Sequence, residues 1–226
     1  MKHPTPLYLA GFVLIALRGL PCAAAESTHD FARWEPEIAA MEAADRESPP
    51  PKGGILFAGS STIRMWKTLA ADYPDQKVIN RGFGGSEIVD STHFAERIIF
   101  PCAPRAVFLR AGGNDLADGK TPAQVFGDFK DFVAAVHAKL PATEIYFISW
   151  APTVLRWEQR DREKELNESA EAFARATPHV HYVPAHDFVV GPDGRPRAEL
   201  FLKDGLHFNA AGYRLLVECV RPYLPR

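Results

Sequence analysis

An aspartate and a histidine near the end of the chain stand three residues apart, at Asp204 and His207. At the start of a helix, this spacing lets the carboxylate accept a hydrogen bond from one imidazole nitrogen while the other nitrogen faces a cleft. Such a pair forms the base and its orienting acid in a nucleophilic triad. The spacing also fits a helix cap followed by a surface histidine, so the pair alone leaves both interpretations open.

Three short apolar runs upstream are each followed by residues that could complete such a site. Two serines, Ser60 and Ser61, follow the first run, the glycine-rich loop 81–86 follows the second, and Gly112–Asp115 follow the third. Two of these segments have a simpler structural interpretation, because Ser61 can cap a helix and Gly112–Asp115 are turn-forming residues. The loop 81–86 could bind phosphate, but it lacks the residues that end a phosphate-binding loop. Because functional groups gather at the carboxyl ends of parallel strands, we expect these segments to share one cleft with the Asp–His pair.

Apolar runs of strand length alternate with segments of helical periodicity from residue 30 onward. This alternation predicts one α/β domain in which a parallel sheet is covered on both faces. The expected strands are 55–58, 77–80, 106–109, 144–149 and 180–183, and the expected helices are 30–47, 63–69, 88–99, 121–140, 157–176 and 210–220.

Length and composition are those of an ordinary globular protein. The chain has 226 residues, enough for one domain with a full core, and 46% of them are hydrophobic while 24% are charged. The formal net charge is −2, and no long basic run is present, which argues against nucleic acid as a partner.

The first 25 residues predict a secretory signal peptide. Lys2 precedes the apolar run Leu7–Leu17, and the small residues Ala23–Ala25 offer a cleavage site before Glu26. The run is shorter than the roughly 20 apolar residues that a membrane span needs. We therefore expect an exported protein, periplasmic or secreted, whose mature domain covers 26–226 and has no stable membrane span.

The mature chain would keep two cysteines, Cys102 and Cys219. In an oxidising compartment this pair could form one disulfide. If the closing helix runs antiparallel to the strands, Cys219 ends near the amino edge of the sheet, where Cys102 is expected. The alternative is two free thiols in apolar surroundings, and the sequence leaves both possibilities open.

Together, four motifs resemble the conserved blocks of the SGNH, or GDSL-type, hydrolases, and most of all bacterial members akin to platelet-activating-factor acetylhydrolase subunits. These motifs are Phe57–Thr62, Gly82–Gly85, Gly112–Asp115 and Asp204–His207, in the order of the family. The resemblance implies a flavodoxin-like three-layer α/β/α sandwich around a parallel five-stranded sheet. It also implies serine ester hydrolysis without a metal or cofactor.

The resemblance assigns a role to five residues. Ser61 matches the nucleophile, and Asp204 and His207 match the acid and base of the triad. The backbone N–H of Gly85 and the side chain of Asn114 match two donors of the oxyanion hole, with the N–H of Ser61 as the third. These groups would let Ser61 attack an acyl carbon while His207 takes its proton.

One position departs from the family pattern. The family commonly has Gly-Asp-Ser in its first block, whereas this chain has Gly59-Ser60-Ser61. The missing aspartate is not the triad acid, so we expect catalysis to survive. The register of the block favours Ser61 over Ser60 as the nucleophile.

Other functions remain as alternatives. A catalytically weak carbohydrate- or lipid-binding module on the same fold would lack one of the five groups, and none is missing. A metal-dependent hydrolase could use histidines near the fifth strand, although a structural role is the simpler interpretation. The absence of a GxSxG motif disfavours the α/β-hydrolase fold. The residues in question for a metal site are His179, His181, His186 and Asp187.

The substrate is predicted only as a class. The loops after the strands are short and no segment resembles a large apolar lid, which favours a short acyl group. An acetylated glycan, a lysophospholipid or a small ester would fit an exported enzyme equally well. The segment 149–157 follows the fourth strand and is expected to form a wall of the pocket.

Overall fold

The computed structural model describes residue 1 and residues 29–225, and the chain from Phe31 to Arg226 forms one compact unit. Apart from Met1, the predicted signal peptide lies outside the described residues, as does Cys22. None of the helices in residues 29–225 has the length and apolar character needed to cross a membrane.

A five-stranded sheet lies at the centre of this unit, and all of its strands are parallel. The spatial order is β2-β1-β3-β4-β5, so β1 and β3 are flanked on both sides and are buried along their whole length. The α/β domain with a parallel sheet is therefore confirmed. The strands are β1 (Ile55–Gly59), β2 (Val78–Gly82), β3 (Ala106–Arg110), β4 (Glu144–Ile148) and β5 (Val180–Val183).

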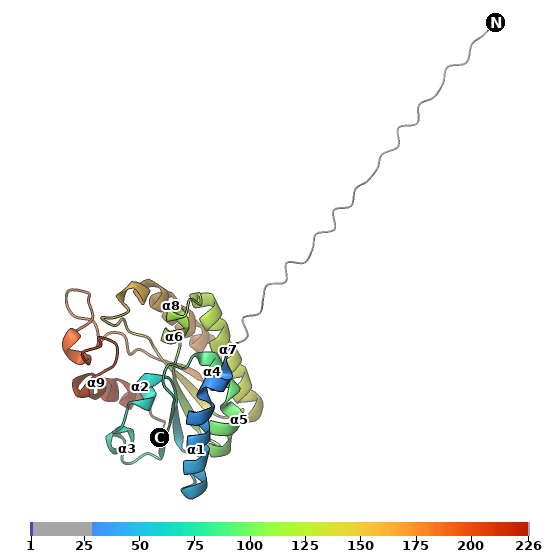
Figure 1. The fold of residues 1–226 in the computed structure, drawn as a ribbon, viewed down its shortest axis with the longest axis vertical. Coiled ribbons are helices and arrows are strands. Elements are labelled where there is room, and N and C mark those ends of the chain that lie inside the picture. The colour runs from blue at the N-terminus through green and yellow to red at the C-terminus, as the bar shows by residue number, and fades with distance from the viewer. Residues whose placement is uncertain (2–28, 226) are drawn as a thin grey trace. The chain divides into compact units, whose positions relative to one another are not determined.

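Helices cover both faces of the sheet and complete the three-layer α/β/α sandwich (Figure 1). The face that carries the side chains of Leu56 and Val107 packs against α1 (Glu35–Glu47), α4 (Ile88–His93), α5 (Ala95–Ile98), α7 (Pro122–Lys139) and α8 (Arg160–Ala176). The opposite face packs against α2 (Ser61–Arg64), α3 (Leu69–Asp72) and α9 (Ala210–Val220). The short helix α6 (Gly113–Ala117) follows β3, and 3-10 turns lie at Phe31–Trp34, Phe100–Cys102, Trp157–Gln159, Ala198–Leu200 and Arg221–Tyr223.

A row of aromatic rings crosses the second face of the sheet. Phe57, Phe108 and Tyr146 lie opposite one another on adjacent strands. Their rings stack with centroids 4.9 Å and 4.4 Å apart. Such cross-strand pairs fix the register of the parallel strands, and therefore fix which residues reach the carboxyl edge together.

The strand boundaries and the ends of the long helices agree with the expected ranges to within about two residues. The helices α1 and α8 begin later than expected, after the 3-10 turns at Phe31–Trp34 and Trp157–Gln159, whereas α7 and α9 begin within about one residue of the expected position. The start of α7 shows why: Thr121 Oγ1 accepts from the N–H of Gln124, and Gln124 Oε1 accepts from the N–H of Thr121. This capping box precedes Pro122, which suits the first turn of a helix, so the helix begins where the sequence indicates.

Two expected helices are interrupted. The segment 63–69 splits into α2 and α3, because Trp66 leaves the helical path to enter the core and its indole N–H donates to Asp72 Oδ2 at 2.7 Å. The segment 88–99 breaks at Phe94, whose buried ring meets Phe83 edge to face. In both segments, burial of one aromatic ring stabilises the protein more than an unbroken helix would. Residues such as Thr and His have a low helix propensity, so little is lost where the helix breaks.

The disulfide is not formed. Cys102 and Cys219 are free thiols, and they belong to the cores on opposite faces of the sheet. The expectation placed both residues near one edge but did not take into account that the sheet separates them. The alternative of two free thiols is the one that the structure has.

Candidate active site

Three side chains from two distant parts of the chain form one line of hydrogen bonds. The hydroxyl oxygen of Ser61 lies 3.0 Å from His207 Nε2, and His207 Nδ1 lies 2.7 Å from Asp204 Oδ2. With the Nδ1 proton directed at the carboxylate, Nε2 is left to accept the proton of Ser61. This arrangement can deprotonate the serine as it attacks an electrophile.

The turn that carries Asp204 fixes its carboxylate. Oδ1 accepts from the backbone N–H groups of Leu206 and His207, at 2.9 Å and 3.0 Å, while Oδ2 faces the imidazole. The hydrogen bond with His207 and then these two amides lower the pKa of Asp204 to about 2. The carboxylate is therefore charged at every pH at which the protein would be assayed.

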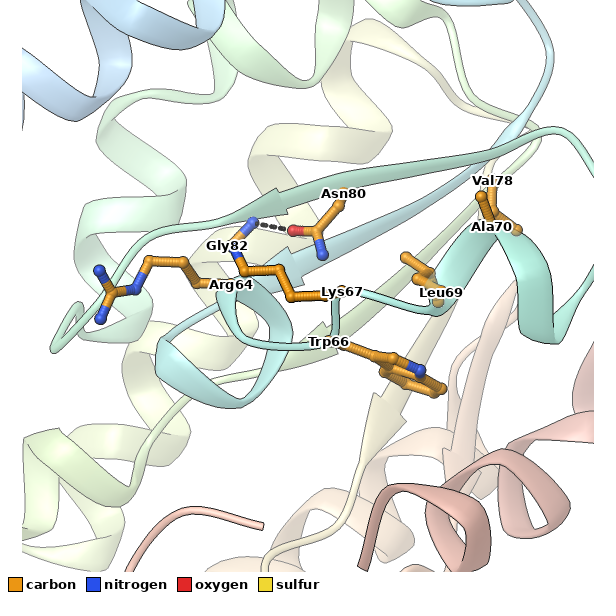
Figure 2. A pocket seen from close by; sticks show the side chains of 8 residues that line it. All are labelled: Arg64, Trp66, Lys67, Leu69, Ala70, Val78, Asn80 and Gly82. Carbon is orange, nitrogen blue, oxygen red and sulfur yellow. Dashed lines mark hydrogen bonds between the residues drawn. The ribbon is translucent and has the colours of Figure 1, made fainter. Parts of the chain in front are cut away.

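Contacts from both sides hold the turn at Ser61. Ser60 donates its backbone N–H to the carbonyl of Arg110, the last residue of β3, and Tyr213 donates its hydroxyl to the carbonyl of Thr62. Asn80 joins α2 to β2, because Nδ2 donates to the carbonyl of Ile63 while Oδ1 accepts from the N–H of Gly82; Figure 2 shows the second of these bonds. Of the two serines, Ser61 is the one whose hydroxyl meets His207.

The loop after β2 carries Gly85, the glycine whose backbone N–H is expected to donate to the oxyanion. Gly85 has a φ of +76°, a conformation that favours glycine, and a Cβ there would lie 3.2 Å from the ring of Trp34. Ser86 anchors the loop through its hydroxyl, which donates to the carbonyl of Phe83 at 2.9 Å. Within residues 29–225, the N–H groups of Gly85 and Ser61 have no hydrogen-bond acceptor, so both are available to a ligand.

Asn114, at the start of α6, lies against the same loop. Its Nδ2 donates to the carbonyl of Ser86 at 2.9 Å, and its Oδ1 accepts from Arg156 Nη1 at 3.0 Å. A guanidinium can only donate, so Arg156 fixes which end of the amide is nitrogen. Sequence reasoning did not identify Arg156, because it belongs to no motif and reaches Asn114 only through the fold.

Gly113 and its neighbour Gly112 make room for Trp150. A Cβ on Gly113 would lie 2.7 Å from the indole, whose N–H donates to the carbonyl of Ala111 at 2.8 Å. The pocket beside Ser61 is lined by Trp150, Thr153 and Arg156, so the segment 149–157 forms a wall, as predicted. The other lining residues are Ser60, Ser61, Thr62, Arg110, Asn114, Leu206, His207 and Phe208.

Asp115, the last residue of the third motif, has a different position. Its carboxylate is fully buried, accepts from the N–H of Ile88 at 3.2 Å and lies 3.4 Å from Lys120. Burial raises the pKa of this carboxyl to about 7. Asp115 is absent from the pocket lining and instead joins α6 to the start of α4, next to the loop of Gly85.

The histidines considered for a metal site bind carboxylates. His179 and His181 contact the two oxygens of Glu144, at 2.8 Å and 2.6 Å, and His186 contacts Asp187 at 3.1 Å. Glu144 begins β4, which places the first pair at the amino edge of the sheet, away from Ser61. Within residues 29–225, no three His, Cys, Asp or Glu side chains are arranged to hold a metal ion.

A larger hollow, of about 330 Å³, lies beside β2, and its lining contains no serine, cysteine or histidine (Figure 2). It is lined by Arg64, Trp66, Lys67, Leu69, Ala70, Val78, Asn80 and Gly82. Its lining holds arginine and lysine but no nucleophile paired with a base, so this hollow offers less chemistry than the pocket at Ser61.

A model of the GDSL-like lipase/acylhydrolase family matches residues 52–215. A comparison with curated protein sequences finds no match.

Solved structures share the fold over most of the chain. A Streptococcus pneumoniae protein, provisionally assigned as a platelet activating factor, is 22% identical with a TM-score of 0.77, covering 86% of this chain and 94% of that one. A GDSL-like lipase from Bacteroides thetaiotaomicron is 20% identical with a TM-score of 0.67, covering 86% and 96%. A variant of an acetyl-xylooligosaccharide esterase from Geobacillus is 16% identical with a TM-score of 0.61, covering 78% and 97%.

Proposed function

The chain belongs to the GDSL-like lipase/acylhydrolase family, and we propose that it hydrolyses carboxylic esters through an acyl-enzyme on Ser61. The observation that carries this proposal is the line of hydrogen bonds from Ser61 through His207 to Asp204, with distances of 3.0 Å and 2.7 Å. A nucleophile, a base and an orienting acid in contact are the parts that acyl transfer requires.

In the first half of the reaction, Ser61 Oγ bonds to the acyl carbon as its proton passes to His207 Nε2. Asp204 stabilises the resulting imidazolium and keeps the ring oriented. When the tetrahedral intermediate collapses, the bond to the alcohol oxygen breaks, and that oxygen takes the proton from Nε2. In the second half, water gives a proton to His207 Nε2 as its oxygen bonds to the acyl carbon. The bond from that carbon to Ser61 Oγ then breaks, Oγ takes the proton from Nε2, and the acid leaves.

Three donors would bind the negative oxygen of the intermediate: the N–H groups of Ser61 and Gly85, and Nδ2 of Asn114. The two amides have no other acceptor among the described residues, and Asn114 is fixed by Ser86 and Arg156. Donors held in place before the reaction stabilise developing charge without reorganisation, and loss of one such donor commonly costs a factor of about 10²–10³ in rate.

The walls of the pocket support a short acyl group. The pocket is partly enclosed beside Ser61, and the rings of Trp150 and Phe208 bound it. Substrates of this kind include an acetylated glycan, a lysophospholipid or a small ester. The protein named as an acetyl-xylooligosaccharide esterase shares the fold and favours the first of these.

Export is the remaining part of the proposal. The apolar run Leu7–Leu17 and the small residues Ala23–Ala25 support a signal peptide over residues 1–25, cleaved before Glu26. The mature enzyme would then consist of residues 26–226 and act in the periplasm or outside the cell.

The purified protein should hydrolyse p-nitrophenyl esters, with the highest kcat/KM at acetate or butyrate and a decline toward octanoate, because the pocket is short. A p-nitrophenyl phosphonate should inactivate it stoichiometrically, since Ser61 would attack phosphorus as it attacks an acyl carbon. Absorbance at 400 nm measures the first result, and the mass of the labelled protein measures the second.

EDTA should leave the activity unchanged, which separates serine chemistry from a metal-dependent hydrolase. If no ester from acetate to octanoate is turned over and no phosphonate label forms, the chain is instead a carbohydrate- or lipid-binding module on this fold.

Arg156→Met should lower kcat by a factor of about 10–100 with a smaller change in KM. Without the guanidinium, the amide of Asn114 can rotate and direct its oxygen toward the oxyanion. A hydrogen bond from a charged group is worth about 1.5–3 kcal/mol, which sets the size of the effect. Steady-state kinetics on p-nitrophenyl acetate measure it.

A double-mutant cycle identifies the route of this effect. If Arg156 acts through Asn114, then Arg156→Met should cost little more in an Asn114→Ala background. Arg162→Met is the matched control. Arg156 donates to the carbonyl of Gly113 as well as to Asn114, and Arg162 donates to the carbonyl of Leu116 without a hydrogen bond to Asn114. Full additivity of the two substitutions would show that Arg156 does not position the amide.

A further inference from the structure

Two arginines are buried in the described part of the chain, and one of them has the environment that a buried charge requires. Arg81 is 7% exposed, and its Nη2 lies 2.7 Å from both oxygens of Asp45. Its Nε also donates to the carbonyl of Ile98 at 3.0 Å. A carboxylate partner and hydrogen bonds offset the loss of hydration that a buried cation suffers.

Arg110 is more deeply buried, at 2% exposure, and lacks such a partner. Its Nη1 donates to the carbonyl of Ser149, but its Nε has no acceptor among residues 29–225. Glu163 acts on it only at longer range, without a hydrogen bond. Burial raises the pKa of Glu163 to about 8, so that carboxyl is mostly neutral at pH 7.

The guanidinium of Arg110 faces the pocket of Ser61. It lies 4.9 Å from the ring centroid of Trp150 and 5.7 Å from that of Phe208, and all three residues line the pocket. Among the described residues, the lining includes two arginines, Arg110 and Arg156, and no aspartate or glutamate. The pocket therefore carries an excess of positive charge.

The departure of this chain from its family pattern lies at the same place. Ser60 stands where the family commonly has aspartate, and its backbone N–H donates to the carbonyl of Arg110 at 3.2 Å. Both Ser60 and Arg110 line the pocket, so a neutral hydroxyl stands in the lining where the family pattern has a carboxylate.

We propose that the ester substrate carries an anionic group, a carboxylate or a phosphate, close to the scissile bond, and that Arg110 is its counter-ion. This inference rests on the proposed ester hydrolysis and adds the charge of the substrate to it. The rings of Trp150 and Phe208 shield the site from water, where a charge-assisted hydrogen bond is strongest. The anion can belong to the acyl or the alcohol part of the ester.

Two pairs of esters test the proposal, because within each pair a carboxylate is replaced by an amide of the same shape. Monoethyl malonate and ethyl malonamate place the group on the acyl side, with ethanol release as the measurement. O-Acetylglycolate and O-acetylglycolamide place it on the alcohol side, with acetate release as the measurement. Each kcat/KM is divided by the rate constant for alkaline hydrolysis of the same ester, which removes intrinsic reactivity.

In at least one pair, the normalised kcat/KM of the full-length protein should be about tenfold or more higher for the anionic ester. This factor corresponds to the free energy of one hydrogen bond between charged groups. Arg110→Met should lower this ratio at least about tenfold, and Arg110→Lys should retain part of it. Arg175→Met is the control, since it removes the same charge from an exposed helix position that pairs with Glu171. It should leave the ratio as in the original protein.

Ratios near 1 in both pairs, with the neutral esters turned over, would overturn the inference and leave the proposed hydrolysis intact. No turnover of any of the four esters or of p-nitrophenyl acetate would instead count against the hydrolysis itself.

Thermal unfolding gives a second criterion. The Arg110→Met protein should have a Tm no lower than that of the original protein, because the substitution removes an unpaired buried charge. The Arg81→Met protein should have a lower Tm, because it loses a paired one. A large loss of stability in Arg110→Met would show that the cation is satisfied internally.

Discussion

Ser61→Ala should lower kcat/KM for p-nitrophenyl acetate by a factor of about 10⁵–10⁶, comparable with removal of the nucleophile from other serine hydrolases. Ser60→Ala should lower it about tenfold or less. The difference follows from position: the hydroxyl of Ser61 lies 3.0 Å from His207 Nε2, whereas Ser60 lines the pocket without meeting the histidine. Initial rates for the three proteins, at enzyme concentrations that reveal the residual activity, measure both effects.

Labelling provides an independent measurement of the same assignment. A p-nitrophenyl phosphonate should modify the peptide that contains both serines, and fragmentation in the mass spectrometer should place the label on Ser61. The Ser60→Ala protein should still be labelled, and Ser61→Ala should not. A label found on Ser60 would refute the assignment.

Asp204→Asn should lower kcat by a factor of about 10⁴ with little change in fold. The asparagine oxygen can still accept from the backbone amides of Leu206 and His207, but its NH₂ would donate to Nδ1 and move the imidazole proton to Nε2. In that tautomer His207 cannot accept the proton of Ser61. Steady-state rates between pH 6 and 8, with circular dichroism for the fold, measure the effect.

The pH dependence of this prediction follows from the depressed pKa of Asp204, about 2. A carboxylate with a lowered pKa is charged at all pH values above it, so Asp204 does not titrate between pH 6 and 8, and the loss should be the same factor throughout. Asp187→Asn is the matched control, because Asp187 contacts His186 on an exposed surface. A loss smaller than tenfold for Asp204→Asn would exclude an orienting role.

Local patterns in the sequence determine most of the fold. The runs 55–58 and 106–109 are apolar throughout because both strands are covered on both faces, and alternation with helices then requires parallel strands. The rule that functional groups gather at the carboxyl edge of a parallel sheet predicts from topology alone that Ser61 and His207 share one cleft. Such features depend on spacing within a short segment or on topology alone.

Features that depend on packing between distant segments could not be predicted in this way. The breaks at Trp66 and Phe94 arise because each ring finds a place in the core, which no helical periodicity records. The positions of Cys102 and Cys219 depend on the face of the sheet as well as on its edge. The burial of Arg110 likewise cannot be predicted from the sequence, because an arginine at the end of an apolar strand has the same sequence pattern whether its side chain is buried or exposed.

The contact between Trp34 and the loop of Gly85 has a consequence for where this protein can be shortened. The match to the family begins at residue 52, yet Trp34, just before α1, packs against Phe83 with ring centroids 5.7 Å apart and backs Gly85, whose amide is a proposed oxyanion donor. Arg97 further ties α1 to the body through Glu42. A fragment cut at the family boundary would keep every proposed catalytic residue but lose the support behind one proposed oxyanion donor, so we expect the functional unit to be longer than the segment that the family model matches.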